Sequence, residues 1–150
     1  MDWIKLLNSR CRWERRTAAE ALGELRDPQA VPALLRALID DDWRVRELAC
    51  WALGMIGDPK AVPSLIQAMQ DGDRDVCRAA ALALGAIGDP QAVPALIQAL
   101  RDSDEDVCVA AAKALGMIGD PQAIPALQKA RADSSWHVRR AAAEALAELG

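Results

Sequence analysis

The chain has 150 residues, of which 52% are apolar and 27% charged, and it carries a formal net charge of −4 at pH 7. This composition excludes a disordered chain, and no run of about 18 apolar residues is present to cross a membrane. Nucleic acid is disfavoured as a partner, because duplex binding relies on a basic face and no Lys/Arg run exceeds two residues.

Ala and Leu dominate the apolar residues, whereas Tyr and Phe are absent and the aromatic residues are five Trp. Because Ala and Leu favour helices and aromatic residues favour strands, the composition predicts an all-α chain. The four cysteines form no Cys-x-x-Cys pair, and Met1–Leu7 is too short for the apolar part of a secretory signal. A reducing, cytoplasmic setting is therefore expected.

One repeat of constant length runs through the chain. The segment RDPQAVPALLRAL begins at Arg26, and related segments begin at equal intervals, at Gly57, Gly88 and Gly119. A second motif, ACWALGMIG in one unit and AAAEALAELG in the last, keeps the same step. The spacing predicts a single domain, 1–150, of about five units. Their approximate bounds are 1–26, 27–57, 58–88, 89–119 and 120–150, with the first unit truncated.

Each unit is predicted to be a helical hairpin. In residues 58–88, Asp58 is suited to cap a helix that Pro59 opens, with Pro63 in its first turn or at its true start. A second helix is predicted from about Arg74 to Ile87, because its apolar residues recur at the spacing of one buried face. A hairpin of this size cannot bury its apolar face alone, so neighbouring units must stack.

The pattern D-P-x-A-V-P-x-L, followed by V-R-x-x-A-A-x-A-L-G-x-I-G, resembles the HEAT-like repeats of the phycobilisome-lyase type. It is also similar to engineered consensus α-helical repeat binders. The resemblance implies an all-α, right-handed α-solenoid in which the second helix of each unit lines a concave face. No residue matches a catalytic role and no nucleotide-binding, hydrolase or zinc-protease motif is present, so we expect a chain that is not an enzyme and has no cofactor.

Three outward positions recur in every second helix, opposite the buried side. In order of unit, they hold Arg16, Glu20 and Glu24; Glu47, Trp51 and Met55; Arg78, Leu82 and Ala86; Val109, Lys113 and Met117; and Arg140, Glu144 and Glu148. The outer units are charged here, whereas the middle units carry apolar side chains that charged residues would normally replace. Stacking places equivalent positions side by side, which predicts one apolar patch for a partner.

The predicted partner-binding residues are Glu47, Leu48, Trp51, Met55, Arg78, Leu82, Val109, Lys113 and Met117. This patch favours a non-catalytic scaffold that binds another protein. Two alternative functions remain open, namely a groove for a flat hydrophobic molecule such as a tetrapyrrole, and self-association through the same patch. In a further alternative, the apolar side chains pack into the seams between second helices and bind nothing.

Cys77 and Cys108 replace an arginine that other units have at Arg46 and Arg139. In the family this arginine looks like a polar contact across the seam. Equivalent residues of stacked helices lie about 8–10 Å apart, whereas a disulfide needs Cα atoms within about 7 Å. The two thiols are therefore interpreted as half-buried small residues. The single histidine, His137, lacks the partners that a metal site or catalysis requires.

Overall fold

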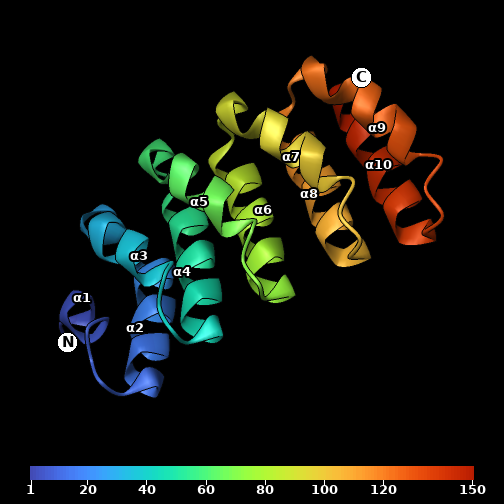
Figure 1. The fold of residues 1–150 in the computed structure, drawn as a ribbon. Helices are drawn as coiled ribbons and strands as arrows, with labels where there is room; N and C mark the ends of the chain where they lie inside the picture. Colours follow the sequence, from blue (N-terminus) through green and yellow to red (C-terminus); the bar gives the residue numbers. More distant parts are fainter.

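In the computed structural model, which describes all 150 residues, the chain forms ten α-helices and no strand. The helices are α1 (Trp3–Leu6), α2 (Arg12–Leu25), α3 (Val31–Ala37), α4 (Trp43–Ile56), α5 (Val62–Ala68), α6 (Arg74–Ile87), α7 (Val93–Ala99), α8 (Glu105–Ile118), α9 (Ile124–Ala130) and α10 (Trp136–Leu149). The hairpins follow one another in a single direction, and the two termini lie at opposite ends (Figure 1). The all-α repeat architecture predicted from the sequence is confirmed.

The first helix of a unit is split into two parts. Residues Pro59–Ala61 form a 3₁₀ turn, and α5 begins only at Val62, with Pro63 in its first turn. Pro63 has no N–H to donate to the preceding turn, so the chain tightens there and the backbone N–H of Ala61 donates to the carbonyl of Asp58 at 3.1 Å. The side chain of Asp58 caps the turn, as predicted, by accepting from the N–H of Lys60.

The second helix matches its predicted bounds. Helix α6 runs from Arg74 to Ile87, and its cap is Asp73, whose carboxylate accepts from the backbone N–H groups of Asp75 and Val76. It ends at Gly88, which adopts the left-handed conformation at φ +79°. Glycine reaches this conformation without the Cβ clash that other residues meet, so the repeated glycine stops the helix at one fixed residue.

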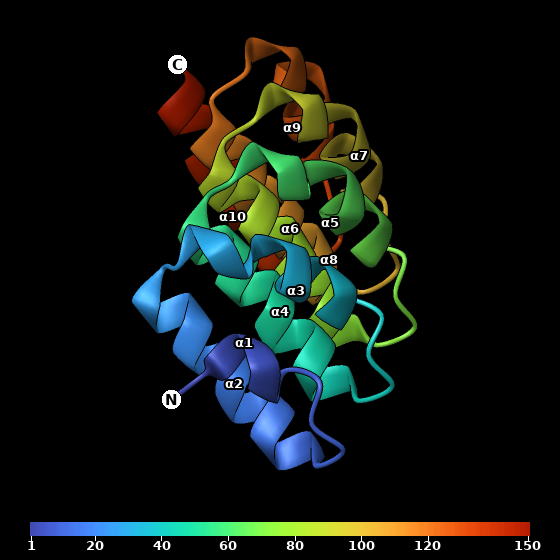
Figure 2. The same cartoon turned by 90° about the vertical axis from the view of Figure 1, so that its left-hand side faces the viewer.

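The helices form two layers. Each second helix (α2, α4, α6, α8 and α10) packs along the next one, whereas neighbouring first helices make no extended contact with each other. Figure 2, which views the stack from its N-terminal side, shows the units laid one upon the next. The core lies between the layers and includes one fully buried leucine from each of the helices α2 to α9. These residues are Leu22, Leu34, Leu53, Leu65, Leu84, Leu96, Leu115 and Leu127.

The second helices approach closely at a repeated glycine. A Cβ atom added to Gly85 would lie 2.7 Å from the Cα atom of Ala114 on the next helix. The same approach recurs at the other three junctions, with separations of 2.9–3.1 Å. The pairs there are Gly23 with Ala52, Gly54 with Ala83, and Gly116 with Ala145. Only glycine opposite a small residue allows this spacing.

An arginine joins adjacent units at the N-terminal junctions. Arg46 forms an ion pair with Asp71 of the next unit at 2.8 Å and donates to the carbonyl of Asp40 in its own unit at 2.7 Å. At the equivalent position, the thiol of Cys77 donates to the carbonyl of Asp71 at 3.0 Å. Cys77 and Cys108 are 2% and 3% exposed, so they are small buried residues, more deeply buried than predicted.

We expect Gly85→Ala to lower the free energy of unfolding, because overpacking a tight core costs about 1–3 kcal/mol. This loss should exceed the roughly 1 kcal/mol that alanine gains over glycine inside a helix. Urea unfolding followed by circular dichroism measures it. Gly72→Ala is the control, because a Cβ at Gly72 meets nothing within 4 Å. Equal stability of the two variants would show that the junction is not tightly packed.

Candidate functional site

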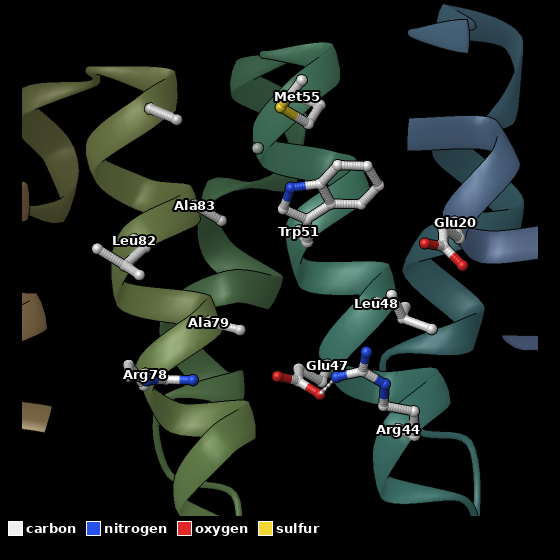
Figure 3. A pocket seen from close by; sticks show the side chains of 12 residues that line it. Glu20, Arg44, Glu47, Leu48, Trp51, Met55, Arg78, Ala79, Leu82 and Ala83 are labelled. Atoms are coloured by element: carbon white, nitrogen blue, oxygen red, sulfur yellow. Dashed lines mark hydrogen bonds and ion pairs between the residues drawn. The ribbon is translucent and has the colours of Figure 1, made fainter. Parts of the chain in front are cut away.

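A groove of about 460 Å³ lies on the second helices α2, α4 and α6, on the side that faces away from the core. Seven of its twelve lining residues are hydrophobic. It brings together six of the nine residues predicted to bind a partner, namely Glu47, Leu48, Trp51, Met55, Arg78 and Leu82. Figure 3 shows that Trp51 lies at its centre on α4, between α6 and α2.

Trp51 is partly packed and partly free. Its ring lies over Gly23 of α2, where an added Cβ would come within 2.4 Å of ring carbon Cζ3. The side chain nevertheless remains 37% exposed. Trp51 therefore has both kinds of contact. One part of the indole packs into the seam between α2 and α4, in a slot that glycine leaves open, and another part faces the groove.

The other apolar residues of the predicted patch are also accessible. Leu82 is 37% exposed and Met117 is 54% exposed, whereas Met55 and Val109 are half-buried. Figure 3 shows Glu20, Trp51 and Leu82 at one level on three successive helices. The repeat thus aligns equivalent outward positions across the stack, as the sequence predicts.

Charged residues border this groove, and most of them are paired. Glu47 forms an ion pair with Arg44 of its own helix, and Arg78 lies 3.7 Å from Asp75. Arg16, at the same level on α2, donates to both carboxylate oxygens of Asp42 at 2.7 Å, and these hydrogen bonds lower the pKa of Asp42. By contrast, Glu20 lines the groove and forms no ion pair.

The remaining predicted residues lie further along the same layer. Val109 and Lys113 line a second, smaller groove of about 290 Å³ between α8 and α10, together with His137 and Arg140. Met117 belongs to neither groove and lies over Gly85, with its Sδ atom 3.1 Å from where a Cβ would be. The predicted patch is thus two grooves and a methionine between them.

Sequence reasoning missed two parts of this surface. Arg44 lines the first groove and His137 the second, and both occupy the same position of the repeat in different units. Applying the repeat to this position would have found them. The slot at Gly23 gave no such signal, because every junction has a glycine and only at this one does an aromatic ring cover it.

No helix of the structure has the length and apolar character needed to cross a bilayer. No three side chains of His, Cys, Asp or Glu gather where they could share a metal ion.

Comparison with known proteins relates the whole chain to one family. A family model described as HEAT repeats matches residues 1–84 and again residues 62–147. A chain from the complex of CpcE and CpcF of phycocyanin lyase from Nostoc sp. PCC7120 is 34% identical, with a TM-score of 0.88. That match covers 98% of the present chain and 63% of the other, so the present chain spans less than two thirds of its length.

Two designed proteins have the same fold. An engineered protein is 26% identical with a TM-score of 0.71, over 98% of the present chain and 77% of its own. A designed armadillo repeat protein, solved in complex with the peptide (KR)4, has a TM-score of 0.73 over 99% and 80% of the two chains. At 19% identity this second likeness concerns the fold alone. No curated protein matches the chain.

Three of the four cysteines are buried within the helices that form this surface. Burial raises the pKa of the Cys50 thiol to about 12 and that of Cys108 to about 11, and it also raises the pKa of Cys77. All four cysteines are free, and Cys11 alone is exposed. The buried thiols therefore stay protonated and unreactive at neutral pH.

We expect the free energy of unfolding to fall as the pH rises above 9. An unfolded Cys50 thiol ionises near its ordinary pKa of 9.0, whereas the folded one stays protonated up to about 12. Ionisation then favours the unfolded chain by about 1.4 kcal/mol per pH unit across this window. Cys50→Ala introduces the residue that other units have at Ala81 and Ala112. It should reduce the fall in the free energy of unfolding with pH, measured by urea unfolding at pH 8–11.

Cys11→Ala is the control, since Cys11 is the one exposed cysteine. Parallel curves for the wild type and Cys50→Ala would show that the Cys50 thiol ionises as easily in the folded chain as in the unfolded one.

Proposed function

This chain belongs to the HEAT repeat family, and on that premise we propose that it is a non-catalytic scaffold that binds another protein through its second helices. The partner occupies the face that α4, α6 and α8 present. The observation that carries this proposal is the partial exposure of Trp51, Leu82 and Met117 at equivalent or neighbouring outward positions. Exposed apolar side chains gathered on one face are typical of interaction sites.

The packing of the layers supports a concave binding face. Second helices contact one another along their length, whereas first helices do not. In a curved stack, the closely spaced layer lies on the inner side. The groove of Trp51 and Leu82 therefore faces the inside of the curve, where a partner meets several units at once.

Trp51 has the properties of an anchor. Its ring rests in the Gly23 slot and loses little conformational freedom on binding, while its exposed part offers apolar area. Tryptophan is among the residues that most often dominate interface energies. Met55 lies in the same groove and Met117 lies further along the face, over Gly85. The flexible side chains of both adapt to partners of irregular shape.

The composition of the groove favours a binding function over a catalytic one. Its polar side chains are the carboxylates of Glu20 and Glu47 and the guanidinium groups of Arg44 and Arg78. A catalytic centre usually pairs a nucleophile or general base with a group that orients it. The residues of this groove supply binding contacts and charge, and we assign them no catalytic step.

A second candidate function is supported by the size of the groove. Its volume of about 460 Å³ lies within the range of small-molecule sites, and its lining is mostly hydrophobic. The similar chain from Nostoc sp. PCC7120 belongs to a phycocyanin lyase. A flat hydrophobic molecule, such as a tetrapyrrole, would stack against the exposed part of Trp51.

We expect Leu82→Glu to weaken partner binding strongly while preserving the fold. Because Leu82 is 37% exposed, its replacement should change the melting temperature by only about 2 °C. Peptides selected on the wild type from a random displayed library should lose at least about tenfold in affinity, or about 1.4 kcal/mol, by fluorescence anisotropy.

Ile39→Glu is the matched control, since Ile39 is 87% exposed and outside both grooves. Selected peptides that bind both variants equally would contradict the proposed face. A large loss of thermal stability in Leu82→Glu would instead show that Leu82 serves the core.

For the small-molecule candidate, we expect protein purified from its natural source to show a visible absorption band that Trp51→Ala removes. Added biliverdin should also quench the tryptophan fluorescence of the wild type. A colourless protein whose fluorescence biliverdin leaves unchanged would exclude this second function.

A further inference from the structure

One outward position of the second helices changes in chemistry across the stack. It holds Glu20, Trp51, Leu82, Lys113 and Glu144, each one repeat length after the one before. Glu144 is paired with Arg140 of its own helix, and we call the first four residues the central row. Figure 3 shows the first three at one level on α2, α4 and α6. The row is acidic at one end, apolar in the middle and basic at the other end.

Both charges of the central row lack a partner within the chain. Glu20 and Lys113 are exposed, and neither takes part in any ion pair. Arginines elsewhere on this face are engaged, Arg16 with Asp42 and Arg140 with Glu144 at 2.9 Å. The two ends of the central row are thus free to attract opposite charges from outside.

The face also restricts the conformation of its occupant. An extended peptide exposes its backbone N–H and C=O groups, which need partners when they are buried. The outward positions supply no Asn, Gln, Ser or Thr side chain, and in the middle of the groove Trp51, Leu82 and Met55 offer those groups only the indole N–H of Trp51. An α-helix satisfies its own backbone and presents only side chains.

The spacing of the units suits such a helix. Neighbouring packed helices lie about 8–10 Å apart, and the close glycine–alanine contacts here require a value within that range. A helix rises about 1.5 Å per residue, so seven residues, or two turns, advance it by about 10.5 Å, slightly more than one unit. A helix that crosses the stack obliquely can therefore keep positions i, i+7, i+14 and i+21 near the four residues of the central row on one side.

We propose that the second-helix face binds an amphipathic helix of a partner protein whose stripe carries a basic residue, two apolar residues and an acidic residue. The basic residue lies against Glu20, the apolar pair against Trp51 and Leu82, and the acidic residue against Lys113. This inference rests on the proposed function and adds the conformation and charge order of the partner.

A displayed library tests it. The library is an Ala- and Gln-based helical peptide of about 28 residues in which only positions i, i+7, i+14 and i+21 are randomised. The wild type should select opposite charges at the outer positions around two apolar residues. Lys113→Glu should select basic residues at both ends, and Glu20→Lys should select acidic residues at both ends.

Individual peptides from these selections measure how much a charge reversal changes the affinity. A peptide selected by the wild type should bind Lys113→Glu about fivefold more weakly, as expected when a half-exposed ion pair becomes a repulsion. A peptide with basic residues at both outer positions should bind Lys113→Glu as tightly as the first peptide binds the wild type. Circular dichroism checks that both charge variants stay folded, which their exposed positions predict.

Three outcomes would overturn the inference. One is selection of the same outer residues by all three proteins. Another is that Leu82-dependent binders come only from a companion library of proline-containing, extended peptides. The third is a wild-type dimer, seen by light scattering, that Leu82→Glu makes monomeric, because a second copy would then occupy the face. By contrast, a lack of any Leu82-dependent binder would contradict the proposed function itself.

Discussion

The contact between a glycine and an alanine on successive second helices determines most of this structure. Because no side chain separates Gly85 from Ala114, the two helices meet nearly backbone to backbone. The same contact at all four junctions keeps the second helices closely spaced and equally aligned. Equivalent residues therefore fall into rows, and side chains that are a full repeat apart in sequence form a continuous surface in space.

Beside this uniform contact, the polar links between units vary along the stack. Arg15 and Arg46 each join two units through an aspartate and a backbone carbonyl, and both are largely shielded from solvent. At the next two junctions Cys77 and Cys108 keep only the carbonyl contact within their own unit. The shielded ion pair from this repeat position is thus confined to the first two junctions, whereas the third has a more exposed pair between Arg74 and Asp102 at 3.0 Å. The first junction also holds the packed ring of Trp51 over Gly23.

Most of the fold follows from spacing alone. The bounds of α6 and the aspartate cap at Asp58 were predictable, because apolar periodicity and capping chemistry are local properties. The outward position of Trp51 and Leu82 was predictable for the same reason. What spacing could not reveal is how far each side chain tilts into a neighbour, since this depends on the atoms of the next helix. The sequence alone therefore predicted one patch, whereas the side chains form two grooves.

The uniform junction also bears on how such a surface changes during evolution. Since every joint uses the same pair of small residues, tandem duplication or loss of one unit leaves the remaining joints intact. The length of the binding surface can then change in increments of about one helix spacing, roughly 8–10 Å, without redesign of the core. Substitutions at row positions that no junction packs, such as Leu82, can follow independently, so stability and recognition at those positions are separable under selection.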